Sequence, residues 1–352
     1  MSETWFQTLT ALRNSPKSCG NVPLALEPSP PDTRDWQFAK FTSTASALPR
    51  KFSRRAEMPP VRNQQQFGTC AAHAGWAAKS WQARQKGTEP AGGLSPLFLY
   101  SLSRQIAGIK DSAGTTLRAI MQTLQKSGDC AENDFPYYLL TNDINPPMPS
   151  ASVINKATAF EISNYAAICL TTDQSRVGAV DMIKRAILEQ GPVLIGIVVC
   201  ENFTSITGPD YIIPLPQGKI LGAHGMVLCG WDDDKGAFED MNSWGCEWGD
   251  QGYGWLLYDW VTAKYDNLWW PFMEAWTSLD LPYQLKSAKE IILWLNDNHA
   301  YVDGNNETMD QPPIFIDNTN RTMIPLRWVA EHLGYIVNWQ ERTKTIELRR
   351  PN

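Results

Sequence analysis

The sequence predicts an α+β fold with two lobes, one helical and one built from antiparallel strands, followed by a small α+β domain. Helical patterns dominate between residues 70 and 190, whereas extended apolar runs dominate after Pro192. A second change of pattern, at residues 279–287, precedes a shorter unit with its own strands and helix. The 352 residues are enough for two domains of unequal size.

These shifts divide the chain into four parts. We expect an irregular, proline-rich arm over residues 1–48 with a short helix near residues 3–13, a main domain over 49–278, a linker over 279–287 and a second domain over 288–352. The arm is either a reduced prosegment that covers a cleft or a surface-packed extension.

Four helices are expected in the main domain. The alanine-rich segment after Cys70 runs for about four turns to Gly87. Ser95-Pro96 has the N-cap and first-turn residues of a second helix. Apolar residues at helical spacing predict a third helix that ends at Gly128 and a fourth that ends before Gly191: Leu117, Ile120, Met121, Leu124; Val180, Ile183, Ile187, Leu188.

Strands follow in both domains. Val193–Val199 and Gly225–Trp231 are apolar runs, and the turn at residues 232–236 predicts an antiparallel return over Ala237–Trp244. The second domain has predicted strands, one helix and a closing hairpin: Glu290–Leu295, Tyr301–Asp303; Pro325–Gly334; Tyr335–Trp339, Thr345–Leu348.

Composition excludes several classes of protein. A net charge of −6 and the absence of a basic stripe argue against a nucleic-acid partner. Seven cysteines without a CxxC pair and only four histidines predict no zinc site, no dense disulfide framework and no metal or cofactor. We find no secretory signal and no run of 18 apolar residues, so we expect no membrane span. Cytoplasmic and unconventionally exported proteins both agree with this pattern.

Cys70 is the candidate nucleophile. The thiolate is the reactive form of cysteine, and a helix N-terminus lowers the pKa of a thiol because the helix dipole favours negative charge there. Cys70 begins the predicted helix. His73 would share that helix and is interpreted as a packing residue, whereas His299 and His332 fall in the second domain.

His224 is the candidate general base. It opens the apolar strand at residue 224, where a strand end can present a side chain to a cleft. An antiparallel return places Asn242 beside His224, where it can accept a hydrogen bond and fix the tautomer, with Trp244 shielding that bond from water. Gln64 offers an amide N–H to an oxyanion, with the Cys70 backbone N–H as second donor.

These segments resemble the papain family of cysteine peptidases. Asn63-Gln64-x5-Cys70, Ala223-His224-Gly225 and Asn242-Ser-Trp-Gly-x2-Trp-Gly-x2-Gly-Tyr-Gly254 occur in that family's chain order. The resemblance covers residues 47–277 and implies a two-lobed fold with the active site between the lobes. It also implies peptide-bond cleavage through a thioester acyl-enzyme.

The same resemblance suggests which residues would contact the substrate. Gly114 would lie along the cleft wall, with Trp244 and Ala223 also beside the substrate, although a helix-entry loop is an equal interpretation of Gly114. Phe67 stands where many members have a disulfide-forming cysteine, Ala71 replaces a common Trp, and Ala223 stands where papain has an acidic residue. The groove is therefore expected to differ locally from that of papain.

The C-terminal segment resembles a second family. Residues 314–339, Ile-Phe-Ile-Asp-Asn-x2-Arg-Thr-Met-Ile-Pro-Leu-Arg-Trp-Val-Ala-Glu-His-Leu-Gly-Tyr-Ile-Val-Asn-Trp, look like the copper amine oxidase N-terminal-like domain common in bacterial proteins. That domain does not carry the oxidase's copper, so no copper is predicted here. Its role is either contact with a protein or cell-surface partner, or passive packing.

Three functions remain open at this stage. The leading hypothesis is a thiol peptidase acting on a peptide or protein substrate. A Cys-dependent acyltransferase or amidase would use the same Cys-His-Asn geometry. A catalytically silent peptide-binding scaffold is the third, which the set of Gln64, Cys70, His224 and Asn242 disfavours.

Overall fold

The computed structural model describes residues 9–32, 34–42, 47–173, 175–204, 206, 208–264, 270–279, 291–302, 305–316, 321–340 and 345–349. The chain forms two compact units, Met1–Asp280 and Leu281–Asn352. The predicted linker falls almost wholly outside the described residues, as do residues 3–8 of the predicted first helix, Glu290 and Asp303. No helix among the described residues is long and apolar enough to cross a membrane.

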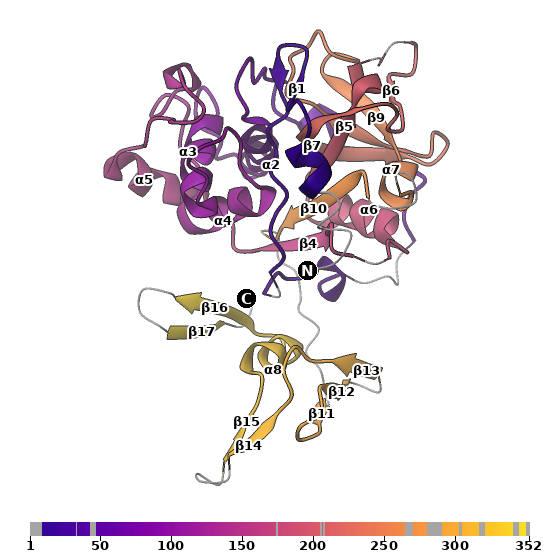
Figure 1. Cartoon of the computed structure of the whole chain (residues 1–352). Helices are drawn as coiled ribbons and strands as arrows, with labels where there is room; N and C mark the ends of the chain where they lie inside the picture. The colour runs from indigo at the N-terminus through magenta and orange to yellow at the C-terminus, as the bar shows by residue number, and fades with distance from the viewer. Residues whose placement is uncertain are drawn as a thin grey trace. The chain divides into compact units, whose positions relative to one another are not determined.

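The first lobe of the larger unit is helical, as expected (Figure 1). Its helices are α2 (Cys70–Gln85), α3 (Pro96–Ala107), α4 (Leu117–Ser127) and the short α5 (Ala151–Ala157). Ser95 caps α3 by accepting from the Phe98 backbone N–H, and Thr116 caps α4 through the Ala119 N–H. α2 is buried along most of its length, and its alanines let α3, α4 and the sheet pack against it.

The second lobe is an eight-stranded, mainly antiparallel sheet. Its strand order is β4-β10-β5-β7-β8-β9-β6, with β3 also paired to β7. The bounds are β3 Lys51–Ser53, β4 Tyr165–Cys169, β5 Val193–Cys200, β6 Ile212–Ile213, β7 Ile220–Asp232, β8 Ala237–Met241, β9 Tyr253–Leu257 and β10 Phe272–Ser278. Two helices pack by this sheet, α6 (Ala179–Glu189) and α7 (Asp259–Thr262). Single 3-10 turns occur at Phe38–Lys40, Arg55–Glu57, Tyr137–Leu139, Thr158–Phe160 and Glu201–Thr204.

The prediction that His224 opens its strand is wrong. β7 begins at Ile220, so His224 is an interior residue of a 13-residue strand. The reason is tertiary: β5 pairs with β7 back to Ile220, and the arm pairs alongside at Ala223. The return strand β8 ends at Met241, which leaves Asn242 immediately after it.

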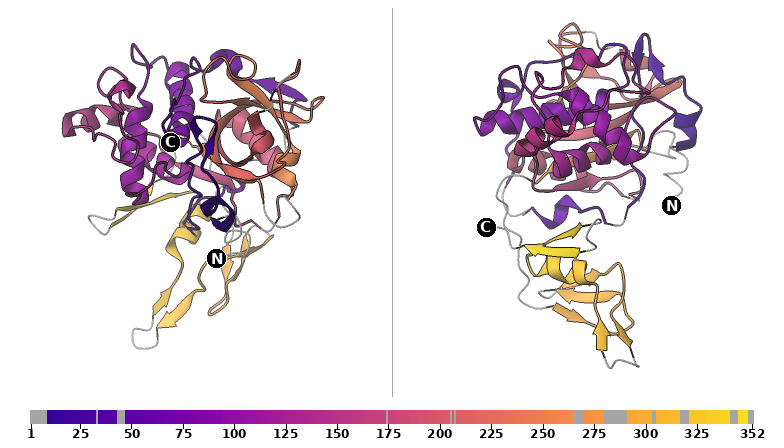
Figure 2. Two further views of the ribbon diagram at one scale, coloured as in Figure 1. Left: turned by 45° about the horizontal axis from the view of Figure 1, so that its top comes forward. Right: turned by 90° about the vertical axis from the view of Figure 1, so that its left-hand side faces the viewer.

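The arm contributes little secondary structure of its own. Residues 9–13 are helical, and β1 (Ser18–Cys19) pairs with β2 (Val22–Pro23). Beyond β2 the arm runs between the helices and the sheet, as the indigo trace in the left view of Figure 2 shows, and it pairs with Ala223 of β7 and with Thr115 before α4. Leu24, Ala25 and Leu26 are buried there.

The smaller unit has three short sheets and one helix. A three-stranded sheet holds β11 (Ile291–Leu293), β12 (His299–Val302) and β13 (Asn305–Thr308). The remaining elements are the pairs β14 (Ile314–Ile316) with β15 (Arg321–Met323) and β16 (Ile336–Gln340) with β17 (Thr345–Arg349), and the helix α8 (Leu326–His332). Ala300, Met309 and Trp328 form its core.

Candidate active site

Cys70 is the first residue of α2, and its side chain is fully buried. β7 approaches this helix end closely at Gly225, where an added Cβ would lie 3.1 Å from the Ala71 Cα. The glycine therefore lets the strand pass beside the nucleophile. Backbone N–H groups of Gly225, Ala71 and Ala25 act on the Cys70 sulfur and lower the pKa of the thiol.

His224 and Asn242 are hydrogen-bonded, with 2.7 Å between His224 Nε2 and Asn242 Oδ1. The Asn242 oxygen also accepts from the Ser243 backbone N–H at 2.7 Å. Because this oxygen can only accept, His224 Nε2 carries the proton and Nδ1 keeps a lone pair. That is the tautomer a general base requires.

Aromatic rings cover this hydrogen bond. The centroid of Trp244 lies 4.9 Å from that of His224, and Phe203 packs against both at 5.5 Å from Trp244 and 6.3 Å from His224. Excluding water strengthens the His224–Asn242 bond, because a hydrogen bond is electrostatically stronger in a low dielectric and no water competes for its atoms. The structure thus places Trp244 as a shield over the pair, the position that the sequence suggested.

Gln64 is fully buried and held at both ends of its amide. Its Oε1 accepts from the Ser243 Oγ at 2.7 Å, which leaves Nε2 to donate. Nε2 donates to the Phe67 carbonyl at 2.9 Å and lies 3.4 Å from the Pro23 carbonyl of the arm. The donor expected at an oxyanion therefore contacts a backbone oxygen of the arm.

The arm backbone contacts Ala223 and the segment around Gly114. The Leu26 N–H donates to the Ala223 carbonyl at 3.1 Å, and the Glu27 N–H donates to the Thr115 carbonyl at 3.1 Å. Gly114 has φ +93°, and a Cβ on it would overlap the Ala25 carbonyl. Of the predicted substrate-contacting residues, Ala223 and Gly114 thus both contact the arm backbone.

The arm presents different peptide units to the Cys70 sulfur and to the Gln64 amide. It runs parallel to the segments at Ala223 and Thr115. An amide N–H, that of Ala25, acts on the Cys70 sulfur, while the carbonyl facing Gln64 belongs to Pro23. The carbonyl at the oxyanion donor and the amide at the sulfur thus come from different peptide units, so no single peptide bond is presented for attack.

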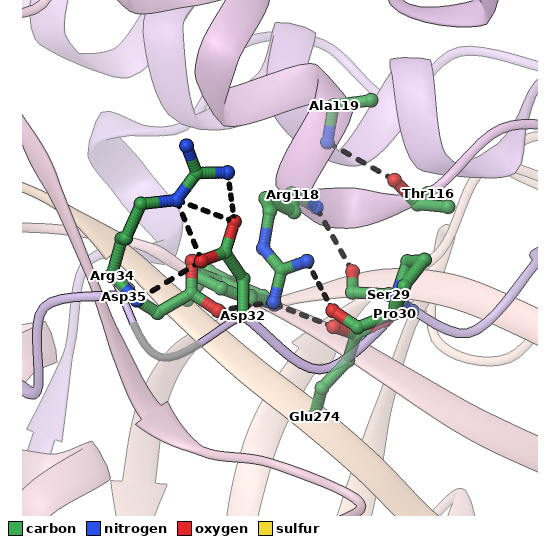
Figure 3. A network of polar contacts seen from close by, with 10 residues as sticks. Ser29, Pro30, Asp32, Arg34, Asp35, Thr116, Arg118, Ala119 and Glu274 are labelled. Carbon is green, nitrogen blue, oxygen red and sulfur yellow. Dashed lines mark hydrogen bonds and ion pairs between the residues drawn. The ribbon is translucent and has the colours of Figure 1, made fainter. Parts of the chain in front are cut away.

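A buried polar network anchors the arm beyond the cleft (Figure 3). The Arg118 guanidinium on α4 forms an ion pair with Asp35 and donates to the Pro30 carbonyl. The Ser29 backbone N–H donates to Glu274 on β10 at 3.2 Å. Arg118 and Asp35 are 8% and 4% exposed, so neither charge has water as an alternative partner.

Burial disfavours the charged forms of Cys70 and His224. Desolvation raises the pKa of the Cys70 thiol above its ordinary value, against the effect of the nearby N–H groups. Desolvation also lowers the pKa of His224 to about 4, although the bond to Asn242 acts in the opposite direction. Both shifts favour neutral thiol and neutral imidazole while the arm is in place.

Comparison with known proteins identifies a family for each of the two units. A family model described as papain family cysteine protease matches residues 48–264. The chain belongs to the papain family. A second model, the copper amine oxidase N-terminal domain, matches residues 283–348 and thus covers most of the smaller unit.

Solved structures similar to this papain-family chain come from organisms that are only distantly related to each other. Xylellain, a cysteine protease from Xylella fastidiosa, matches with a TM-score of 0.59 at 25% identity over 72% of this chain and 94% of its own. Digestive procathepsin L 3 of Tenebrio molitor matches with a TM-score of 0.51 at 19% identity over 79% of each chain, which shows the shared fold.

Among curated sequences, an uncharacterized peptidase C1-like protein of Acanthamoeba polyphaga mimivirus is 28% identical over 206 residues. This match spans 57% of the chain and 65% of that protein. Cathepsin S of Bos taurus is 24% identical over 259 residues, which are 72% of this chain and 68% of the relative.

Several site residues escaped the sequence reasoning. Ser243 lies inside the recognised motif, so its position could have suggested a role beside Asn242. Tyr137 donates to the Gln64 carbonyl at 2.9 Å, and Asp143 accepts from the Gly68 N–H at 2.7 Å. Tyr137 begins a 3-10 turn and Asp143 lies in an irregular segment. Neither segment has a sequence motif that predicts these contacts. Within the described parts of the chain, no three His, Cys, Asp or Glu side chains lie together as metal ligands would.

Proposed function

We propose that this chain is a cysteine peptidase that hydrolyses peptide bonds, with Cys70 as nucleophile and His224 as general base. The observation that supports it best is the 2.7 Å His224–Asn242 bond, on a strand that passes beside the helix end bearing Cys70. A binding-only cleft has no need of a fixed imidazole tautomer at a buried thiol.

The proposed reaction has an acylation step and a deacylation step, and His224 transfers protons in both. His224 Nδ1 takes the Cys70 proton, and the thiolate attacks the carbonyl carbon while the oxyanion accepts from Gln64 Nε2 and the Cys70 N–H. The C–N bond then breaks, and His224 gives its proton to the leaving amine. Water, deprotonated by His224, hydrolyses the thioester and releases the carboxylic acid and the free thiol.

We further propose that residues 1–48 form an inhibitory prosegment. Its backbone occupies the Ala223 and Thr115 carbonyls and faces the Gln64 amide, and its burial of Cys70 and His224 favours their uncharged forms. The arm thus blocks the cleft and also removes the thiolate that an attack would need.

The test is labelling with an epoxysuccinyl peptide inhibitor, mapped by mass spectrometry. We expect slow labelling of the intact chain, rapid single-site labelling of Cys70 after the arm is removed, and none in Cys70→Ala. Equal rates with and without the arm would contradict the prosegment. No labelling of either form would overturn the peptidase and favour the peptide-binding scaffold.

Peptide turnover then separates hydrolysis from acyl transfer. A peptide library incubated with the arm-free enzyme should yield free carboxylates whether or not an amine acceptor is added. Products that require the amine would instead indicate an acyltransferase.

For residues 281–352 we propose attachment to a protein or cell-surface partner. The supporting observation is the number of large apolar side chains that this unit exposes, among them Trp294, Leu295, Met323 and Trp339. A chain ending at residue 280 should label at Cys70 as the full chain does while losing such attachment.

A further inference from the structure

His73 lies one helical turn after Cys70, and its ring is 2% exposed. Its Nδ1 is 3.1 Å from the Thr69 carbonyl oxygen and 3.2 Å from Thr69 Oγ1. A carbonyl oxygen only accepts, so Nδ1 carries the proton. Burial lowers the pKa of His73 to about 4, which keeps the ring neutral and leaves Nε2 as a hydrogen-bond acceptor.

From Thr69, hydrogen bonds continue around the nucleophile. Thr69 Oγ1 is 2.7 Å from Tyr137 Oη, which donates to the Gln64 carbonyl at 2.9 Å. Gln64 Oε1 accepts from the Ser243 hydroxyl, and the Ser243 N–H donates to Asn242 Oδ1. The contacts therefore connect His73 with Asn242 by way of Gln64, through both its backbone carbonyl and its side-chain amide.

The remaining gap lies between Asn242 and His73. His73 Nε2, Asn242 Nδ2 and Trp76 Nε1 are buried, and none has a hydrogen-bond partner among the described residues. All three residues line one cavity of about 10 Å³. A space of that size holds about one water, and such waters make about three hydrogen bonds.

The polarity of these atoms suits one water. Asn242 Nδ2 and Trp76 Nε1 are donors, whereas the tautomer set by Thr69 makes His73 Nε2 an acceptor. A water can accept from the first two and donate to the third. An unmet polar group at such depth costs about 1–3 kcal/mol, so the arrangement favours occupancy.

We propose that one buried water joins His73 Nε2 to Asn242 Nδ2, which makes His73 a positioning residue for the catalytic amide. With Nδ2 held by the water, Asn242 presents Oδ1 to His224 and so selects the Nε2–H tautomer. The flipped amide would place its N–H groups against the Ser243 backbone N–H, so that donors would face a donor. This inference rests on the proposed role of His224 as base.

The test uses the full chain, because both the cavity and the tautomers are present with the arm in place. A crystal structure that orders other buried waters should show a water among His73, Trp76 and Asn242. Nitrogen NMR of histidine-labelled protein should show His73 as the Nδ1–H tautomer and His224 as the Nε2–H tautomer. Four histidines keep the spectrum readable.

Two substitutions separate positioning from packing. His73→Phe keeps an aromatic ring but removes the acceptor, so we expect loss of the water and tautomer averaging at His224. His73→Gln places an amide oxygen near the former Nε2 and should restore both. His299→Phe, on the exposed side of the smaller unit, should leave the His224 signals unchanged.

An empty cavity in the wild type, or an unchanged His224 tautomer in His73→Phe, would overturn the proposal. If His73→Phe does not fold, the wild-type water and tautomers still decide it. These readouts need no peptide turnover. Failure of Cys70 to react with the epoxysuccinyl inhibitor would therefore count against the peptidase and not against the water.

Discussion

At the scale of single residues, the site is set by which end of each side-chain amide faces the nucleophile. Asn242 offers its oxygen to His224, and the Ser243 N–H donates to that same oxygen. Gln64 offers its nitrogen to the cleft because the Ser243 hydroxyl donates to the amide oxygen. Ser243 uses its backbone N–H for the first and its hydroxyl for the second. One residue between base and oxyanion donor thus orients both.

Ser243→Ala should lower kcat of the arm-free enzyme about tenfold with little change in KM. Loss of the hydroxyl frees Gln64 to rotate, but the Ser243 N–H still orients Asn242. Removing an oxyanion donor outright costs about 10²–10³ in kcat, so Gln64→Ala should be the more severe change. Steady-state hydrolysis of a fluorogenic peptide measures both.

Ser243→Thr is the matched control, since it keeps the hydroxyl and should retain most of the activity. A raised KM with unchanged kcat in Ser243→Ala would contradict the role given to this residue. It would mean that Ser243 contacts substrate rather than Gln64.

The sequence was sufficient to nominate Gln64, Cys70, His224 and Asn242, because their residue types and order follow one known chemistry. It could not nominate Tyr137, Asp143 or the polar role of His73. Their partners are backbone groups and side chains far away in the sequence, brought close only by packing. His73 was interpreted as a packing residue since helical geometry alone points its ring away from the cleft.

At the scale of elements, the arm is the part that sequence reasoning left undecided. Its docking depends on the Ala223 and Thr115 carbonyls and on the space over Gly114, none of which has a signature in the arm itself. The start of α3 is predictable because Ser95 caps its own helix locally. Helix capping depends on neighbouring residues and can be read from the sequence, whereas docking of the arm depends on tertiary contacts and cannot.

Arg118→Ala should loosen the arm and speed the labelling of Cys70 in the intact chain at least tenfold. Removing one partner of a buried ion pair costs about 3–5 kcal/mol, since Asp35 is left buried without the Arg118 guanidinium. Burial raises the pKa of Asp35 to about 6 even beside Arg118, so part of this cost is met by protonation of the carboxyl. The loss falls mainly on the docked arm, which carries Asp35. Inhibitor-labelling rates measured by intact mass provide the readout.

Arg34→Ala is the matched control in the same network (Figure 3). Arg34 pairs with Asp32 but is 73% exposed, and exposed pairs contribute about 0–1 kcal/mol. Its labelling rate should equal that of the unmodified chain. Equal rates for Arg118→Ala and Arg34→Ala would show that the arm is held elsewhere.

At the scale of the whole molecule, the order of helices before strands was enough to predict two lobes. It did not predict that β10, the last strand of the larger unit, lies between β4 and β5. Such a return depends on pairing between segments 80 and 106 residues apart in sequence, as at Ala275 with Ile195 and with Cys169. The sheet therefore closes only once nearly the whole unit is present.

The sheet also holds a carboxyl group at a cost to the stability of the whole unit. Asp240 on β8 is fully buried, and neither of its oxygens has a hydrogen-bond partner among the described residues. Burial raises the pKa of Asp240 well above its ordinary value. The folded state thus holds the neutral acid, whereas the unfolded chain ionises it above the ordinary carboxyl pKa. The contribution of Asp240 to folding stability is therefore least unfavourable at low pH and becomes more unfavourable as pH rises above the ordinary carboxyl pKa.

Asp240→Leu should stabilise the larger unit, and more at pH 8 than at pH 4. Replacing a buried unsatisfied group by an apolar side chain of similar size recovers about 1–3 kcal/mol. The gain is smaller at pH 4, because Asp240 of the unfolded chain is less ionised there and folding then requires less proton uptake. Calorimetric Tm values of the full chain at both pH values measure the difference. Asp111→Leu, at an exposed position, should give no such pH-dependent gain. An equal gain at both pH values would mean that Asp240 is destabilising through its shape rather than its ionisation.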